Sequence, residues 1–224
     1  MPKLEKDAKR GDKEAAAKFA LAQKLEPHLD AGKPAITFEL EEEEQPIAKS
    51  LFLLTAKPTI FAANVQDGDL ATADSNPHVE TVRAYGREHH GCETVVISAQ
   101  IESELADLDE DEAKEFLADL GVEESGVGLL IRAAYHLLGL RTYFTCGPKE
   151  TRAWTIHIGD TAPQAAGVIH TDFERGFIKA ETVGYEDLIA NGSVLGAKEK
   201  GLYRQEGKDY VVQDGDVILF KFNV

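Results

Sequence analysis

The sequence contains few of the residues that mark secreted, metal-binding or membrane-embedded proteins. It has 2 cysteines in 224 residues, Cys92 and Cys146, and they lie far apart. A disulfide framework is therefore not expected, and a cytoplasmic location is the default. No apolar run approaches the length of a membrane-spanning helix, so no membrane partner is expected. The first residues, Met-Pro-Lys-Leu-Glu-Lys, are charged and lack the apolar core of a signal peptide.

The sequence also lacks a phosphate-binding loop, because no Gly-x-x-x-x-Gly-Lys-Ser/Thr occurs in it. Without that loop a nucleoside triphosphate loses its main phosphate contacts and the hydroxyl that usually holds Mg²⁺. No local motif suggests a Ser-His-Asp or Cys-His order, so no catalytic residue is assigned. His89, His90 and Cys92 lie close together, but no second Cys or His cluster accompanies them. A helix C-terminus, where histidine suits the dipole, explains them better than a metal site.

Positive charge is scarce as well. The 24 Lys and Arg residues are outnumbered by 40 Asp and Glu residues. Residues 141–224 are nearly balanced, with 10 basic and 12 acidic side chains, so residues 1–140 carry a net charge of −14. The front part should repel DNA and anionic membranes, whereas the rear part could still present a local basic face.

Two short apolar segments predict a pair of neighbouring parallel strands. They are Thr59 to Val65 and Thr94 to Ala99. Between them, Ser75-Asn76-Pro77 is typical of a helix start, and that helix should run to about His90. A strand, a crossover helix and a second strand form a parallel unit, and such sheets bind ligands at the carboxyl ends of their strands.

Polar and small residues follow both predicted strands. The amide of Asn64 offers a donor and an acceptor that suit a purine edge. In Asn64-Val65-Gln66-Asp67, valine stands where the familiar guanine reader Asn-Lys-x-Asp has lysine, which weakens a guanine interpretation. The second strand ends in Ser98-Ala99-Gln100, where small residues would let a base approach the backbone. Taken singly, Asn64 is more simply a turn former and Ser98 could equally be a helix cap; together they indicate a site.

Helical signals dominate the first 54 residues. Residues 3–10 and 13–31 predict the unequal arms of a helical hairpin, with Gly11-Asp12 as the turn. The acidic run Glu41 to Glu44 could serve a metal or a basic partner. A solvated first turn of a helix that continues to Leu54 explains it better, because acidic residues suit a helix N-terminus.

Two helices and a β-rich module follow the predicted strands. The helices are Asp109 to Leu120 and Gly126 to Leu140, the second capped by Ser125. From Thr142 onward the sequence predicts short strands around one helix candidate, Pro163 to Phe173. The strand candidates are residues 143–146, 152–158, 177–182, 209–212 and 216–222. This order fits a small mixed sheet with one crossing helix, a β-grasp-like layout.

The β-rich module contains basic side chains that could contact RNA. They are Lys149, Arg152, Arg175, Lys179, Lys198, Lys200 and Arg204. Acidic residues are interleaved with them, so ordinary solvation of a charged surface explains them better than a defined RNA interface.

Several longer runs resemble the YchF / Obg-like ATPase family, and the resemblance extends over essentially the whole chain. They include Arg152-Ala-Trp-Thr-Ile, Thr161-Ala-Pro-Gln-Ala-Ala-Gly and Ile169-His-Thr-Asp-Phe-Glu-Arg-Gly-Phe-Ile178. Glu206-Gly-Lys-Asp-Tyr210, Asp214-Gly-Asp-Val and the closing Phe222-Asn-Val224 are similar to the family's carboxyl end. Leu54-Thr-Ala-Lys-Pro-Thr59 with Asn64-Val65 resembles its base-recognition region.

The resemblance implies an α/β fold in three parts. Residues 1–31 would be a partial coiled-coil hairpin, and residues 32–140 would be the rear half of a P-loop-NTPase-type domain with a partial parallel sheet. Residues 141–224 would form a TGS domain of β-grasp type. The family's phosphate loop and switch regions would lie before Met1, so autonomous hydrolysis is not expected; a natural short reading frame and a fragment both remain open.

The resemblance also implies a function. Family members resemble GTPases but generally prefer ATP, bound with Mg²⁺ in the complete protein. Asn64, Val65 and Ser98-Ala99-Gln100 would then line the adenine pocket, with Asp67 in the acidic position of the base-reading motif. The family associates with ribosomes, and TGS domains are linked to RNA or regulatory contacts. A non-catalytic module that binds ribosome or RNA through the TGS domain and the hairpin is the alternative.

Overall fold

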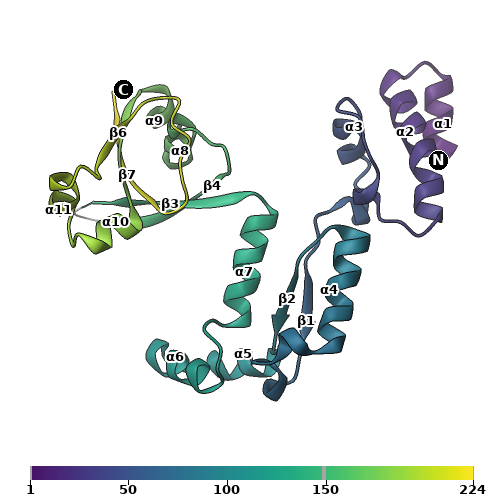
Figure 1. The fold of residues 1–224 in the computed structure, drawn as a ribbon. Coiled ribbons are helices and arrows are strands. Elements are labelled where there is room, and N and C mark those ends of the chain that lie inside the picture. The colour runs from purple at the N-terminus through teal and green to yellow at the C-terminus, as the bar shows by residue number, and fades with distance from the viewer. Residues whose placement is uncertain (1, 148–149, 224) are drawn as a thin grey trace. The chain divides into compact units, whose positions relative to one another are not determined.

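The computed structural model describes residues 2–147 and 150–223, and the chain divides into two compact units, residues 1–134 and 135–224 (Figure 1). Lys149, one of the basic residues predicted to contact RNA, lies outside the described residues. Across the part of the chain that the structure describes, no helix is both long enough and apolar enough to cross a membrane.

Unit 1 begins with the predicted helical hairpin, formed by α1 (Pro2–Lys9) and α2 (Lys13–Asp30) (Figure 1). The turn is fixed by Asp12, whose Oδ1 accepts hydrogen bonds from the backbone N–H groups of Glu14 and Ala15 at 2.9 and 3.1 Å. These contacts satisfy donors that the first turn of α2 would otherwise leave unpaired.

The segment after the hairpin contains short helical elements. They are η1 (Ala35–Thr37), α3 (Gln45–Ser50) and η2 (Leu54–Ala56). Helix α3 is shorter than the predicted helix, because Phe52 has a φ of +51° and leaves the right-handed helical region. In the acidic run before α3, the carboxylate of Glu44 forms an ion pair with Lys24 of α2 at 2.5 Å. This contact connects the segment to the hairpin.

The centre of unit 1 is a strand–helix–strand unit. Strands β1 (Phe61–Asn64) and β2 (Thr94–Ile97) pair in parallel, and α4 (Pro77–His90) connects them. Asn76 caps α4 by accepting from the N–H of His78 at 2.9 Å, as the sequence predicts. A Cβ added to Gly86 would lie 3.3 Å from a ring carbon of Phe61, so the absence of a side chain lets α4 pack closely on the strands. Two short turns, η3 (Asp67–Asp69) and η4 (Ala73–Ser75), link β1 to α4.

Three helices follow β2. They are α5 (Ala99–Leu105), α6 (Glu110–Asp119) and α7 (Gly126–Leu137). Asp109 and Glu112 form a capping box at the start of α6, and Gly121, with a φ of +72°, follows its end. Ser125 caps α7 by accepting from the N–H of Gly128 at 3.0 Å.

Unit 2 is built on a mixed five-stranded sheet with the strand order β4-β3-β7-β5-β6 (Figure 1). The strands are β3 (Leu140–Cys146), β4 (Thr151–His157), β5 (Phe177–Gly184), β6 (Arg204–Glu206) and β7 (Asp216–Phe222). β3 and β7 are parallel, whereas the other neighbouring strands are antiparallel. The helices are α8 (Ala162–Ile169), α9 (Thr171–Arg175), α10 (Tyr185–Ala190) and α11 (Val194–Glu199).

The core of unit 2 lies between the sheet and α8. Ala162, Ala165 and Ala166 of α8 are fully buried, and these small side chains allow the helix to approach the strands. Tyr143 of β3 is also fully buried, and its hydroxyl donates to the carbonyl of Ala165 at 2.9 Å. This bond satisfies a polar group that would be costly to leave unpaired in the core.

Unit 2 contains further segments that differ from the sequence prediction. The single helix expected from Pro163 to Phe173 is divided at His170, which is extended and accepts from the N–H of Asp172. The strand expected at 209–212 is reduced to one bridge between Thr161 and Val211. Helices α10 and α11 were not predicted.

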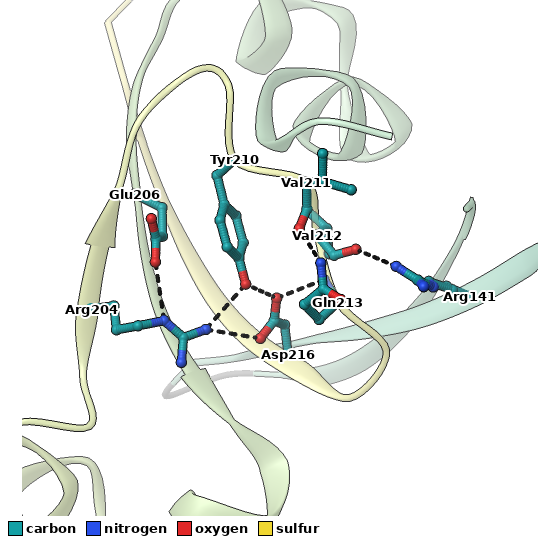
Figure 2. A network of polar contacts seen from close by, with 8 residues as sticks. All are labelled: Arg141, Arg204, Glu206, Tyr210, Val211, Val212, Gln213 and Asp216. Carbon is teal, nitrogen blue, oxygen red and sulfur yellow. Dashed lines mark hydrogen bonds and ion pairs between the residues drawn. The ribbon is translucent and has the colours of Figure 1, made fainter. Parts of the chain in front are cut away.

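A polar network holds the loop between β6 and β7 (Figure 2). Asp216, only 2% exposed, accepts from the hydroxyl of Tyr210 at 2.6 Å and from the backbone N–H of Gln213 at 2.9 Å. Arg204 lies 3.5 Å from Asp216 and 3.0 Å from Glu206. Burial, together with the bond to Asp216, raises the pKa of Tyr210 to about 12. The hydroxyl therefore keeps its proton at neutral pH and remains a donor to the carboxylate.

Replacing Asp216 with Asn should lower the free energy of unfolding by about 2 kcal/mol, because the charged acceptor of the hydrogen bonds from Tyr210, Gln213 and Arg204 is lost. Urea unfolding followed by circular dichroism measures the change. Asp209→Asn is the matched control, since Asp209 is exposed in the same loop and should change stability by less than about 0.5 kcal/mol. Equal effects of the two substitutions would contradict the importance of the network.

Candidate nucleotide-base site

The structure brings the ends of β1 and β2 together. Asn64 lies beside Ile97 in the parallel register, and the backbone N–H of Val65 donates to the carbonyl of Ile97 at 2.8 Å. Val65 and Ala99 therefore emerge at the same edge of the strand pair. This is the edge at which parallel sheets bind their ligands.

Asn64 joins the two strand ends through its side chain. Its Oδ1 accepts from the backbone N–H of Ala99 at 2.9 Å, although 35 positions separate the two residues in the sequence. The acceptor atom is thus used within the protein, and the Nδ2 of this exposed residue remains to donate to a ligand. A donor at this place suits the N7 acceptor of a purine. Because adenine and guanine both carry that acceptor, Asn64 alone would not distinguish them.

Asp67 does not form part of this junction. It starts the η3 turn, and its Oδ1 accepts from the N–H of Gly68 at 2.9 Å. One carboxylate oxygen is therefore engaged in shaping the turn after β1. The other oxygen is available to a ligand, but Asp67 is exposed and is joined to the strand ends only through the chain.

Ser98 is buried at the end of β2, with 1% of its surface exposed. Its hydroxyl has no hydrogen-bond partner within the described residues, and it does not cap α5 although it stands at the cap position. The alternative of an ordinary capping serine is therefore not what the structure shows. An unsatisfied buried hydroxyl is costly, so Ser98 is a polar group at this strand end whose partner the described residues do not supply.

The next two residues differ in their availability. Ala99 is exposed at the first position of α5, where its small side chain leaves room beside the backbone. Gln100 instead points along the helix, and its Nε2 donates to Glu104 at 3.3 Å. The sequence placed both residues at the site; Ala99 lies at the junction, whereas the side chain of Gln100 is engaged elsewhere.

Two residues that the sequence analysis missed shape this edge. The backbone N–H of Gly126, at the start of α7, donates to Glu102 Oε1 at 2.6 Å. A Cβ on Gly126 would lie 2.9 Å from Ile97 Cγ2 and 3.0 Å from Ile97 Cα, so only glycine lets α7 approach the end of β2 this closely. The 24-residue separation of Glu102 and Gly126 left no local signal for this contact.

The structure gives most of the predicted RNA-contacting residues partners within the protein. Arg152 stacks on Trp154 at 4.4 Å, Arg175 lies 4.0 Å from Asp172, and Arg204 belongs to the network around Asp216. Lys179 contacts Glu181, Lys198 covers the ring of Tyr203, and Lys200 is exposed. Most of these cations are therefore engaged with acidic or aromatic neighbours.

The histidine and cysteine residues that the structure describes have local packing roles. Within the described ranges, no three His, Cys, Asp or Glu side chains gather in a geometry that could hold a metal ion. His89 stacks on Tyr85 at 4.3 Å, near the C-terminus of α4. Burial raises the pKa of the Cys92 thiol, which therefore stays protonated and unreactive.

Comparison with known proteins identifies the family. Residues 140–223 match the family model YchF-GTPase_C, described as a protein of unknown function (DUF933). The chain is 50% identical to the ribosome-binding ATPase YchF of Bacillus subtilis over 222 residues, which are 99% of this chain and 60% of that protein. It is 40% identical to Obg-like ATPase 1 of Oryza sativa over 222 residues, 99% of this chain and 56% of that protein.

Solved structures agree with the sequence comparisons. The Schizosaccharomyces pombe YchF GTPase matches with a TM-score of 0.76 and 34% identity, over 92% of this chain and 55% of that one. A GTP binding protein from Pyrococcus horikoshii matches with a TM-score of 0.52 and 19% identity, over 93% of this chain and 57% of that one, which supports the fold alone. The chain belongs to the YchF and Obg-like ATPase family, and it spans about 60% of the length of the curated YchF relatives it matches.

Replacing Gly126 with Ala should destabilise unit 1 by about 1–3 kcal/mol, because the new methyl group would collide with the backbone of Ile97. Urea unfolding of the full chain measures this loss. Gly128→Ala is the control: its Cβ would meet only the flexible side chain of Glu124, and alanine is the better helix former. If both substitutions were equally harmful, the close contact between α7 and β2 would be refuted.

Proposed function

We propose that this chain contains the base-binding side of a nucleotide site in a YchF-type ATPase, with ATP preferred over GTP. The observation that carries the proposal is the junction of Asn64 with Ala99, which joins the two strand ends and leaves the amide nitrogen of Asn64 to act as a donor. These groups fit the polar edge of a purine. In this proposal Asn64, Val65, Asp67, Ser98, Ala99 and Gln100 surround the base, with Asn64, Val65, Ser98 and Ala99 nearest to it.

The proposal assigns three parts to the chain. Residues 1–31 are a helical hairpin of coiled-coil type, residues 32–140 are part of a P-loop-type nucleotide-binding domain, and residues 141–224 are a TGS domain. The β-grasp assignment is supported by the mixed sheet with α8 packed against it. The parallel pairing of β1 and β2 supports the nucleotide-binding assignment.

Nucleotide specificity would be decided by the sequence after Asn64. Val65 offers backbone and van der Waals contacts where a guanine reader has a lysine, and Asp67 has one oxygen engaged with Gly68. Guanine recognition relies on a carboxylate that accepts from two guanine N–H groups. An Asp67 with one oxygen engaged is a weaker partner for that task, which favours adenine.

This sequence does not contain the Gly-x-x-x-x-Gly-Lys-Ser/Thr loop, which binds the phosphates and Mg²⁺ in P-loop proteins. A bound triphosphate with Mg²⁺ would supply the reacting bond. The residues of this chain would bind and orient the base. The 224 residues alone should therefore bind ATP weakly and should not hydrolyse it.

Adenosine and ATP should bind the isolated chain with similar affinities in the millimolar range, because only base contacts contribute. Titration followed by amide NMR should shift the signals of Val65, Ser98 and Ala99, and Asn64→Ala should abolish these shifts. Gln66→Ala serves as the control, because Gln66 is exposed in the same loop and is not assigned to the base. Micromolar ATP affinity with steady turnover by this chain would refute the proposal.

A second candidate function is a non-catalytic module that associates with ribosomes. The observation that favours it is the description of the Bacillus subtilis and Haemophilus influenzae relatives as ribosome-binding ATPases. The contact would use unit 2 and the helical hairpin, and a cytoplasmic location follows from such a partner.

Co-sedimentation with ribosomes tests this candidate. Association should occur at low salt without added nucleotide and should weaken as salt rises, because charged contacts are screened. Lys198→Gln/Lys200→Gln should reduce the sedimented fraction, whereas Lys33→Gln should leave it unchanged if the basic side chains of unit 2 make the contact. Absence of the chain from the ribosome pellet at low salt would rule this candidate out.

A further inference from the structure

One face of the sheet in unit 2 carries a group of charges that the proposed nucleotide-base site does not use. Lys179 of β5 and Lys221 of β7 stand directly opposite each other in the strand register. Like charges in opposite positions destabilise a sheet. We call Lys179, Lys221, Glu181, Tyr203 and Lys198 the lysine face.

The carboxylate of Glu181 contacts both of these cations. Glu181 lies 3.2 Å from the Nζ of Lys179 and 4.0 Å from that of Lys221, and it accepts from the hydroxyl of Tyr203 at 3.0 Å. Burial alone would raise the pKa of Glu181, but the contacts with Lys179, Tyr203 and Lys221 lower it overall. Glu181 is therefore ionised at neutral pH. The Nζ of Lys198 lies 4.4 Å from the ring centre of Tyr203, so a third ammonium group lies over the ring whose hydroxyl bonds Glu181.

The lysine face is open to solvent. The side chains of Lys179 and Lys221 are 36% and 44% exposed, whereas that of Glu181 is 16% exposed. Two apolar residues beside them are more exposed, Leu219 at 47% and Ile178 at 57%. The surface thus combines excess positive charge with exposed aliphatic side chains. The carboxylate of Glu181 is largely buried.

These features favour an acidic polypeptide as the partner. Residues 135–224 carry 10 basic and 12 acidic side chains, which is a poor balance for attracting a long phosphate backbone. The aromatic ring on this face, that of Tyr203, is covered by Lys198, so it does not offer the open stacking surface that single-stranded RNA uses. An acidic peptide with apolar residues could satisfy Lys179 and Lys221 and also cover Leu219.

We propose that the lysine face binds an acidic segment of a partner protein in which Asp or Glu residues are interspersed with aliphatic residues. The carboxylates of the partner would share Lys179 and Lys221 with Glu181. The aliphatic residues would cover Leu219 and Ile178. This inference is independent of the nucleotide-base site, since all of its residues lie in unit 2.

Fluorescence anisotropy with a labelled decapeptide of alternating Glu and Leu tests the proposal on the full chain. The double variant Lys179→Gln/Lys221→Gln should bind about tenfold more weakly than the unchanged chain at low salt. Lys208→Gln is the control, because it removes one exposed cation from the β6–β7 loop. This variant should bind the peptide with the affinity of the unchanged chain. No binding by the unchanged chain, or no loss in the double variant, would overturn the proposal.

Glu181→Gln gives a prediction of opposite sign. Removing the competing carboxylate frees both lysines, so the acidic peptide should bind about threefold more tightly. A purely structural role for Glu181 would give equal or weaker binding in a variant that circular dichroism shows to be folded. A labelled ten-nucleotide uridine RNA distinguishes the other partner class: tighter binding of the RNA than of the peptide, lost in the double variant, would overturn the choice of an acidic polypeptide.

Discussion

The parallel pairing of β1 and β2 is the interaction on which the geometry of unit 1 depends. Two parallel strands have few hydrogen bonds of their own, so the contacts at their carboxyl ends matter more than in a broad sheet. The backbone N–H of Val65 adds a hydrogen bond to the carbonyl of Ile97, and the side chain of Asn64 accepts one from the N–H of Ala99. A change in this pairing would move the strand end, the first turn of α5 and the Ser98 hydroxyl together.

The same edge shows how local and distant constraints are combined. Gly126 allows the first turn of α7 to contact Ile97, and Glu102 then accepts a hydrogen bond from its N–H. Because the carboxylate is on α5, the position of α7 is linked to the helix that begins at Ala99. The proposed base-binding groups are thus held by neighbours that need not touch a ligand. In this arrangement, substitutions away from the strand ends can change the site by shifting its supports.

The sequence was sufficient wherever a short-range pattern determined the local structure. The cap at Asn76, the turn at Gly11-Asp12 and the apolar runs of β1 and β2 all act within a few residues, and the structure has them where expected. Helices α10 and α11 were missed because they are short, six residues each, and carry too little periodic signal. The bond between Glu102 and Gly126 was also out of reach, because it exists only after α5 and α7 have been brought together. At the candidate site, the apolar pattern of the strand predicted the position of Asn64 at its end. The hydrogen-bond partners of the Asn64 and Gln100 side chains could be known only from the folded structure.

Phe52 has a consequence for how unit 1 can move. This residue follows α3 in a left-handed conformation that a glycine would adopt without penalty, and 87% of its surface faces water. Its backbone and its ring are therefore both in unfavourable states at one position. A small rearrangement of the Leu51–Leu54 segment could relax the torsion and shelter the ring at once. This corner of the molecule, rather than the tightly bonded strand ends, is where a change of shape would cost the least free energy.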